Sequence, residues 1–253
     1  MFNPFDYPLL ILVVSLSTFW ICSSIGAWLR KWMGNPGEDN RDDFKFVVGG
    51  TLTLLGLIIG FTFSMAVERY NQRKNLEQQE ANAIGTEYDR ADLLPPTDTA
   101  KVRALLRSYL GQRISSYTLR DEQRSRQIVA QTSRLQTEMW SAVSKSAAAQ
   151  PSPLTALNVA GMNEVLDRQG DAQAARWNRI PVAAWALLIL MSIFCNLLMG
   201  YGVLQRSRFV FLVLPIALSI SLFLIAEIDS PGRGIIRVQP QNLESLSESL
   251  HSR

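Results

Sequence analysis

Long apolar stretches set the pattern of this chain of 253 residues. Four of them contain no Asp, Glu, Lys or Arg, and they cover residues 7–29, 46–67, 180–205 and 209–226. A helix needs roughly 20 predominantly apolar residues to cross a bilayer, and helices buried in soluble proteins rarely run this long without a charge. The pattern therefore predicts four transmembrane spans, at about 7–29, 46–67, 180–204 and 209–226.

Between the second and third spans, the periodicity is that of helices. "PPTDTAKV" supplies two prolines and a Thr or Asp cap at a helix start. The apolar residues that follow recur at three- and four-residue spacings: Val102, Leu105, Leu106, Tyr109, Leu110, Ile114 and Tyr117. Two further helices are predicted around residues 128–143 and 154–166, separated by "AAAQPSP". The sequence has no alternation typical of a strand, so the predicted fold class is all-α.

These elements divide the chain into four parts. A transmembrane hairpin covers residues 1–67, and a helical extramembrane domain that continues the second span covers residues 68–179. A second transmembrane hairpin covers residues 180–226, and residues 227–253 form a C-terminal tail. With four spans, both termini and the helical domain are expected on the same side of the membrane.

The composition removes several classes of protein. Cys22 and Cys195 both lie inside predicted spans, and the single histidine, His251, lies in the tail. The sequence therefore lacks the residues needed for a disulfide framework, a Cys or His metal site or a Ser-His-Asp triad. The net charge is only +3 and basic residues are interspersed with acids, which offers nucleic acid no concentrated basic patch. We expect no enzyme activity, no cofactor and no nucleic-acid partner.

The second span carries a stripe of apolar and polar residues along one helical face. Its members follow at i, i+4, i+8, i+11 and i+15: Thr53, Leu57, Phe61, Ser64 and Glu68. If several copies of this helix surrounded an axis, Leu57 and Phe61 would form an apolar constriction with polar rings beside it. Gly56 and Gly60 form a GxxxG pair on a neighbouring face, where small residues let helices approach closely. Such pairs are common in membrane helices, so ordinary helix packing is the alternative interpretation.

The second span has no break at its polar end. The segment "ERYNQRKNLEQQEANAIGTEYDRADLL" contains strong helix formers and, apart from Gly85, no breaker. One helix is therefore predicted to continue out of the membrane up to Pro95. Its acids Glu77, Glu80 and Glu87 suggest polar contacts between helices. For any single one of them, a solvated face is favoured over an ion site.

Several motifs resemble one known family. "LGLIIGFTFSMAVERYNQRKNLEQQEANAIGTEYDRADLLP", "RALLRSYLGQRI" and the C-terminal "AEIDSPGRGIIRVQPQNLESL" are similar to segments of the bacterial bestrophin-like membrane proteins. More distantly, Gly60-Phe61, the run from Val67 to Tyr70 and Leu105-Leu106-Arg107 resemble motifs of the true bestrophins, which are pentameric ion channels.

The resemblance implies that the second span lines a pore with an apolar neck. The pore-lining residues would be those of the stripe, with Phe61 in the neck and Leu57 one turn before it. Glu227 and Asp229 lie where bestrophins place a segment coupled to gating. Two bestrophin features are missing from the sequence: the acidic calcium clasp of the animal proteins and the Arg-Phe-Pro signature. Calcium gating is therefore not implied, and the ion selectivity stays open.

The leading hypothesis is a bestrophin-like oligomeric membrane ion channel, a pentamer by resemblance. Its partners would be the lipid bilayer, inorganic ions and further copies of the chain. The alternative is a non-conducting membrane scaffold or sensor whose helical domain binds a partner. A secondary transporter is less well supported, because the spans carry no charged residue near the midplane.

The orientation in the membrane does not follow from charge. Lys and Arg near the span ends are divided too evenly between the two sides to decide it. The resemblance implies a multi-pass protein of the bacterial inner membrane, with both termini and the helical domain in the cytoplasm.

Overall fold

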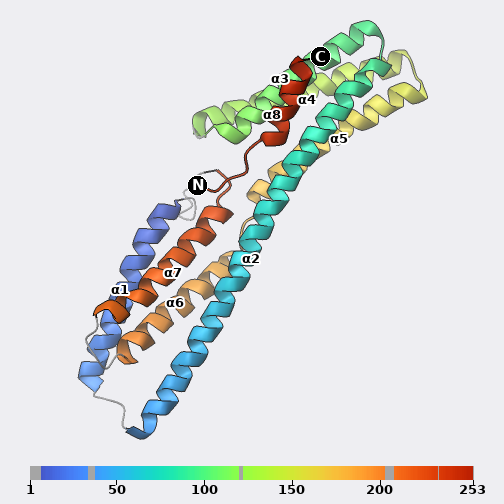
Figure 1. Ribbon diagram of the computed structural model, residues 1–253. Helices are drawn as coiled ribbons and strands as arrows, with labels where there is room; N and C mark the ends of the chain where they lie inside the picture. The colour runs from blue at the N-terminus through green and yellow to red at the C-terminus, as the bar shows by residue number, and fades with distance from the viewer. Residues whose placement is uncertain (1–6, 34–37, 120–121, 203–207, 233, 253) are drawn as a thin grey trace. The chain divides into compact units, whose positions relative to one another are not determined.

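The computed structural model of the protein describes residues 7–33, 38–119, 122–202, 208–232 and 234–252. These residues form helices and no strand, which confirms the all-α prediction (Figure 1). The elements are α1 (Pro8–Met33), α2 (Glu38–Arg90), the short 3-10 helix η2 (Ala91–Leu93), α3 (Pro96–Thr118), α4 (Glu122–Ala149), α5 (Pro153–Trp177), α6 (Val182–Gly202), α7 (Arg208–Asp229) and α8 (Gln241–His251).

Four helical stretches in the described part of the chain are long and apolar enough to cross a membrane. They belong to α1, the first part of α2, α6 and α7, and they correspond to the four spans that the charge-free stretches predict. The predicted end of the third span, at residue 204, lies outside the described residues.

α2 is a single helix of 53 residues, about 80 Å long at 1.5 Å per residue. It passes from its apolar part through Glu68 into its polar part without a break, as the sequence predicts. The helix ends at Arg90, and η2 follows before Pro95. Leu94 is extended, with φ −91° and ψ 163°, because the ring of a following proline disfavours helical backbone in the residue before it.

The chain divides into two compact units. The membrane unit consists of Met1–Arg69 and Arg179–Arg237, and the helical unit consists of Tyr70–Asn178 and Val238–Arg253. α2 contributes its apolar part to the first unit and its polar part to the second.

Two glycines allow α1 and α6 to meet closely in the membrane unit. A Cβ on Gly26 would overlap the carbonyl oxygen of Leu197, and a Cβ on Gly200 would overlap that of Ser23. Small residues are what permit such an approach between membrane helices. Nearby, the Ser23 hydroxyl donates a buried hydrogen bond of 3.3 Å to Oδ1 of Asn196. Backbone proximity and one polar pair therefore specify this contact.

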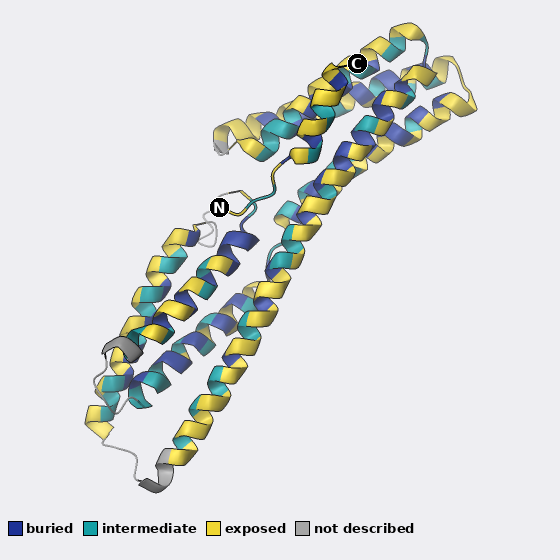
Figure 2. Cartoon of the chain, viewed as in Figure 1, coloured by how far each residue is buried: buried dark blue, intermediate teal, exposed yellow. Residues whose placement is uncertain are grey.

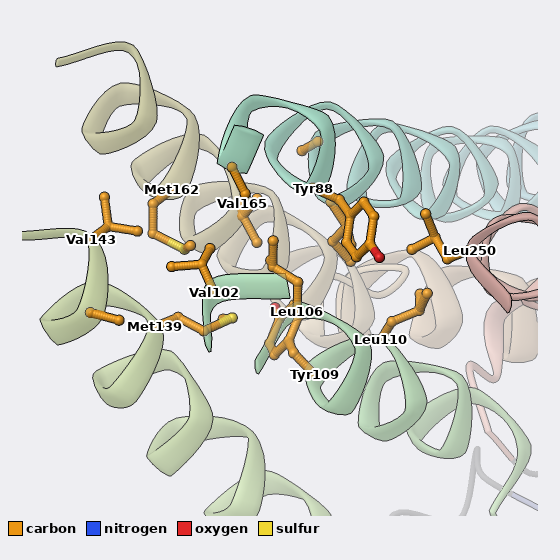
Figure 3. Packing of buried hydrophobic residues seen from close by; sticks show 14 of the residues in the cluster. Tyr88, Val102, Leu106, Tyr109, Leu110, Met139, Val143, Met162, Val165 and Leu250 are labelled. Atoms are coloured by element: carbon orange, nitrogen blue, oxygen red, sulfur yellow. The ribbon is translucent and has the colours of Figure 1, made fainter. Parts of the chain in front are cut away.

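A hydrophobic cluster forms the core of the helical unit. Figure 3 shows its side chains meeting from several helices. The cluster includes Tyr88 of α2, Leu106 and Tyr109 of α3, Met139 and Val143 of α4, Met162 and Val165 of α5, and Leu250 of α8. The periodic apolar stripe predicted on α3 lies at this core, partly or fully buried. The periodicity thus predicted correctly which face of α3 packs.

The C-terminal segment ends in a packed helix. On α8, Leu243 and Leu250 are buried, and the helix contacts α3. Arg107 of α3 donates a hydrogen bond of 3.2 Å to the carbonyl oxygen of Leu250. Residues 241–251 are therefore part of the helical unit and contribute to its core.

The contact between α1 and α6 can be tested with Gly200→Ala. The added methyl group would meet the backbone at Ser23, and overpacking of this kind costs about 1–3 kcal/mol. We expect a lower midpoint of thermal unfolding for the full chain in detergent. The matched control is Gly111→Ala, where a Cβ would meet no heavy atom of the described residues within 4 Å, so its midpoint should be unchanged or slightly higher. Equal midpoints for both variants would contradict the contact.

Candidate functional site

The stripe predicted on the second span lies on an exposed face of α2. Its members Thr53, Leu57, Phe61, Ser64 and Glu68 are all exposed in the single chain, and Figure 2 shows exposed residues along this part of the helix. Leu57 is 54% exposed and Phe61 63% exposed. The structure thus brings the predicted residues onto one open helical face.

The opposite face of the same span is packed within the chain. Leu55, Thr62 and Ala66 are buried, and at 100° per residue they lie roughly opposite Leu57 and Phe61. The span therefore has one face turned to its own chain and another left for lipid or a further chain.

The GxxxG pair also lies on an open face. A Cβ added at Gly56 or Gly60 would meet no heavy atom within 4 Å among the described residues. This contrasts with Gly26 and Gly200, whose small size is already used inside the chain. The helix packing predicted for Gly56 and Gly60 thus needs another molecule and stays a prediction.

The chemistry of the open face changes along the helix. The Thr53 hydroxyl donates a hydrogen bond of 2.9 Å to the carbonyl oxygen of Gly49 in the same helix. The lone pairs of its oxygen remain available to accept hydrogen bonds at the exposed face. Leu57 and Phe61 follow as large apolar side chains, and Ser64 and the carboxyl group of Glu68 follow them. A ring of such faces could combine an apolar constriction with polar rings.

The two acids predicted to belong to a gating segment act as backbone anchors. Both are buried. Oε2 of Glu227 accepts hydrogen bonds from the backbone N–H groups of Ile235, at 2.5 Å, and Ile236, at 3.3 Å. Oδ1 of Asp229 accepts a hydrogen bond of 3.1 Å from the backbone N–H of Ile180. These bonds hold the segment after α7 and Ile180, two residues before the start of α6, and the gating role itself stays a prediction.

The polar part of α2 carries a row of buried charged residues. The sequence predicted polar contacts between helices for its acids but not their burial. Buried positions continue at alternating four- and three-residue spacings into η2: Arg73, Glu77, Glu80, Ile84, Glu87 and Ala91. This is the a/d spacing of a helix-packing seam, but charged residues hold most of its positions. The solvated-face alternative is therefore wrong for the three acids. The heptad spacing was the signal in the sequence that could have identified them.

Glu77 caps the start of α8. Pro240, at the N-cap position, offers no side-chain hydrogen bond to the first turn. Oε1 of Glu77 instead accepts from the backbone N–H groups of Asn242 and Leu243, each at 3.0 Å, and Oε2 accepts from the Asn242 side chain at 2.6 Å. A carboxylate at a helix N-terminus is stabilised by the free N–H groups and the helix dipole.

Glu80 forms a buried two-pronged ion pair with Arg113 of α3. Nε of Arg113 donates to Oε1 of Glu80, and Nη2 donates to Oε2 at 3.2 Å. Both side chains are almost fully buried. Removing one member of such a pair costs about 3–5 kcal/mol, because it leaves the other charge buried without compensation.

Aromatic and basic groups surround this ion pair. The guanidinium carbons of Arg113 and Arg176 lie over the Tyr117 ring, 5.9 and 4.1 Å from its centre. Burial, together with the charge of Glu80, raises the pKa of Tyr117 to about 12. Burial also lowers the pKa of Arg176 from its ordinary value. The phenol therefore stays protonated and uncharged near neutral pH.

Among the described residues, no group of three or more His, Cys, Asp or Glu side chains could hold a metal ion. Of the buried acids of α2, Glu77 is directed at backbone N–H groups and Glu80 at an arginine.

The Bestrophin-like domain model matches residues 17–243, which is most of the chain and includes all four apolar stretches in whole or in part. The chain therefore belongs to the bestrophin-like family. It is a multi-pass membrane protein, as the four spans predict.

Solved structures show the same fold. Crystal structures of a bacterial bestrophin homolog from Klebsiella pneumoniae match nearly the whole chain. One, solved by Zn-SAD phasing, is 15% identical, with a TM-score of 0.67 over 96% of this chain and 97% of that chain. Two point variants of the homolog give TM-scores of 0.66 and 0.69 at 14% identity, each over 97% of this chain. The comparison with curated proteins gave no match.

The cap on α8 can be tested with Glu77→Ala. Hydrogen bonds to charged groups contribute about 1.5–3 kcal/mol, so the backbone amides of Asn242 and Leu243 should exchange with solvent on the order of tenfold faster or more. The measurement is hydrogen exchange with mass spectrometry on the full chain. Glu244→Ala removes an exposed acid from the same turn and should leave these two amides nearly unchanged. Unchanged exchange in Glu77→Ala would contradict the cap.

Proposed function

We propose that the chain is the subunit of a membrane ion channel and that the open face of α2 lines its pore. The observation that carries this proposal is the composition of that face. Two large apolar side chains, Leu57 and Phe61, are exposed on it, flanked by Thr53 on one side and by Ser64 and Glu68 on the other. Exposing a carboxyl group and aligned hydroxyls to lipid alone would be energetically unfavourable. Their position on the same face as Leu57 and Phe61 is instead expected of a face that lines an aqueous pore.

Family membership supports the same proposal. True bestrophins are pentameric ion channels whose second span lines the pore, and the resemblance supports the same arrangement for α2. In a pentamer, Gly56 and Gly60 would allow neighbouring copies of α2 to approach closely. Leu57 and Phe61 would form successive apolar rings that close the pore by excluding water, and Glu68 would form a polar ring at the exit.

The orientation belongs to the same proposal. With the helical unit and both termini in the cytoplasm of a bacterium, Glu68 would lie at the cytoplasmic end of the apolar neck. The segment anchored by Glu227 and Asp229 would follow the fourth span on the same side. Labelling of single cysteines introduced into α8 with a membrane-impermeant reagent, in intact cells and in lysed cells, tests this topology.

A scaffold or sensor that does not conduct is the competing function. The continuity of α2 is the observation that favours it, because one helix could transmit a binding event from the helical unit to the membrane unit. Capture of a stoichiometric partner by the full chain, together with liposomes that remain impermeable to ions, would decide for the scaffold.

The pore assignment predicts that Phe61→Ala increases ion flux through liposomes containing the purified protein. Removing the ring from a constriction widens it and lowers the barrier caused by exclusion of water, so we expect a several-fold increase. Phe63→Ala is the matched control, since Phe63 is also exposed but lies on another face of the same helix. Equal flux in the two variants would argue against Phe61 as a neck residue.

The assembly predicts that Gly60→Leu disrupts the oligomer without unfolding the chain. A Cβ added at Gly60 would meet no described heavy atom of its own chain within 4 Å, so we expect the effect of the larger side chain to arise between copies. We expect the mass of the detergent-solubilised particle to fall towards that of a single chain, while its helical content is retained. Gly111→Leu, at an equally open glycine in the helical unit, should leave the mass unchanged. A ring of unaltered mass in Gly60→Leu would exclude the glycine face from the interface.

A further inference from the structure

One buried acid in the helical unit takes part in neither the α8 cap nor the Glu80–Arg113 pair. Glu87 of α2 is fully buried. Neither of its two carboxyl oxygens has a hydrogen-bond partner among the described residues. Buried polar groups are almost always hydrogen-bonded, and a buried carboxylate without hydrogen bonds or close pairing is costly. Glu87 therefore requires a physical explanation that Glu77 and Glu80 do not.

The carboxyl group of Glu87 lies directly against the backbone of α5. A Cβ on Gly161 would overlap Oε2 of Glu87, so the glycine supplies the space that the carboxyl group occupies. Nη1 of Arg90 reaches the same place, 2.5 Å from that Cβ position, and the other side chains around the carboxyl group are apolar. Ile84 and Tyr88 on α2 and Met162 on α5 are all buried in the surrounding cluster. The acid is thus enclosed between two helices in a site that only a residue without a side chain could leave open.

Few charges act on this site. Arg90, one turn later on α2, is close enough to favour the carboxylate electrostatically, but it forms no hydrogen bond with either oxygen. On η2, Asp92 is exposed and pairs with Arg103 of α3 at 2.7 Å. On α5, Glu164 is exposed and pairs with Arg168 at 3.5 Å. Arg90 is therefore the one cation acting on Glu87 in the described part of the chain.

We propose that Glu87 is a proton-binding site of the helical unit, occupied at neutral pH, whose deprotonation loosens the packing of α5 on α2. A protonated carboxyl group is uncharged and can remain in an apolar contact with the backbone at Gly161. A carboxylate at the same place carries a charge to which no donor of the described residues is hydrogen-bonded, so it favours opening of the contact to water or movement of Arg90 into bonding distance.

Burial favours the protonated form of the Glu87 carboxyl group. Burial raises the pKa of Glu87 to about 8, against the smaller opposing effect of Arg90. The unfolded chain has an ordinary Glu pKa of about 4.3, so the folded state holds the proton more tightly. The stabilisation is therefore fully present below about pH 4.3 and is lost as the pH rises through the folded-state value. Opening of α5 should increase across this window.

This site does not depend on channel activity, because the proton is bound inside the helical unit whether or not the chain conducts ions. Its test therefore uses structural readouts that remain meaningful if the pore proposal fails. The variants are Glu87→Gln, which keeps the shape and removes the titration, and Glu138→Gln, which removes an exposed acid of α4.

The first readout is infrared difference spectroscopy of the full chain in detergent during a pH titration. The wild type should show the carbonyl band of a protonated carboxylic acid at neutral pH, and the band should disappear with a midpoint well above that of ordinary Glu. Glu138→Gln should retain the band, and Glu87→Gln should lose it. A wild type without the band at neutral pH, or a band that persists in Glu87→Gln, would overturn the proposal.

The second readout is hydrogen exchange of the α5 amides around Gly161. In the wild type and in Glu138→Gln, this exchange, corrected for its intrinsic pH dependence, should rise by up to tenfold per pH unit between about pH 5 and pH 8. In Glu87→Gln the corrected rate should be independent of pH. Arg90→Met removes the cation that favours the carboxylate, so it should move the infrared midpoint to higher pH. A pH dependence shared by all the variants would overturn the proposal.

Discussion

Burial of charge along one face of α2 is the constraint on which the helical unit depends. Arg73, Glu77, Glu80 and Glu87 occupy positions where a helix-packing seam normally carries apolar side chains. In the low-dielectric interior each charge must find a partner or lose its charge. Glu80 meets this demand with Arg113 of α3, and Glu77 meets it with the first turn of α8. The positions of α3 and α8 are thus tied to α2 by directional bonds as well as by apolar contact.

The membrane unit follows different rules, because lipid offers no hydrophobic driving force between helices. Gly26 and Gly200 bring α1 and α6 into backbone contact, and Ser23 and Asn196 add a hydrogen bond. The span of α2 instead leaves a face open, where a Cβ added at Gly56 or Gly60 would meet no heavy atom within 4 Å in the described part of the chain. A membrane helix that keeps such a face free is suited to assembly, which is consistent with the family and with the proposed pore.

Sequence reasoning reached the fold more easily than the site. Uninterrupted apolar stretches predicted the spans, and three- and four-residue spacing predicted the buried face of α3, because both depend on patterns local to one helix. The stripe from Thr53 to Glu68 could be identified as one face for the same reason. Whether that face is open could not be predicted, since exposure depends on where the other helices lie. The same limit applied to Glu77, whose partners Asn242 and Leu243 are distant in the chain.

The sequence by itself determined the all-α class, the four spans, and the continuity of α2 from its apolar part into its polar part. Hydropathy and helix propensity depend on residues that are close in sequence, so they can be evaluated without a structure. Only the tertiary structure decided which of the small and charged residues are used inside the chain. Gly26 and Gly60 look alike in sequence, as do Glu80 and Glu87. Their roles differ because burial, pairing and close approach are properties of the residues that surround them in space.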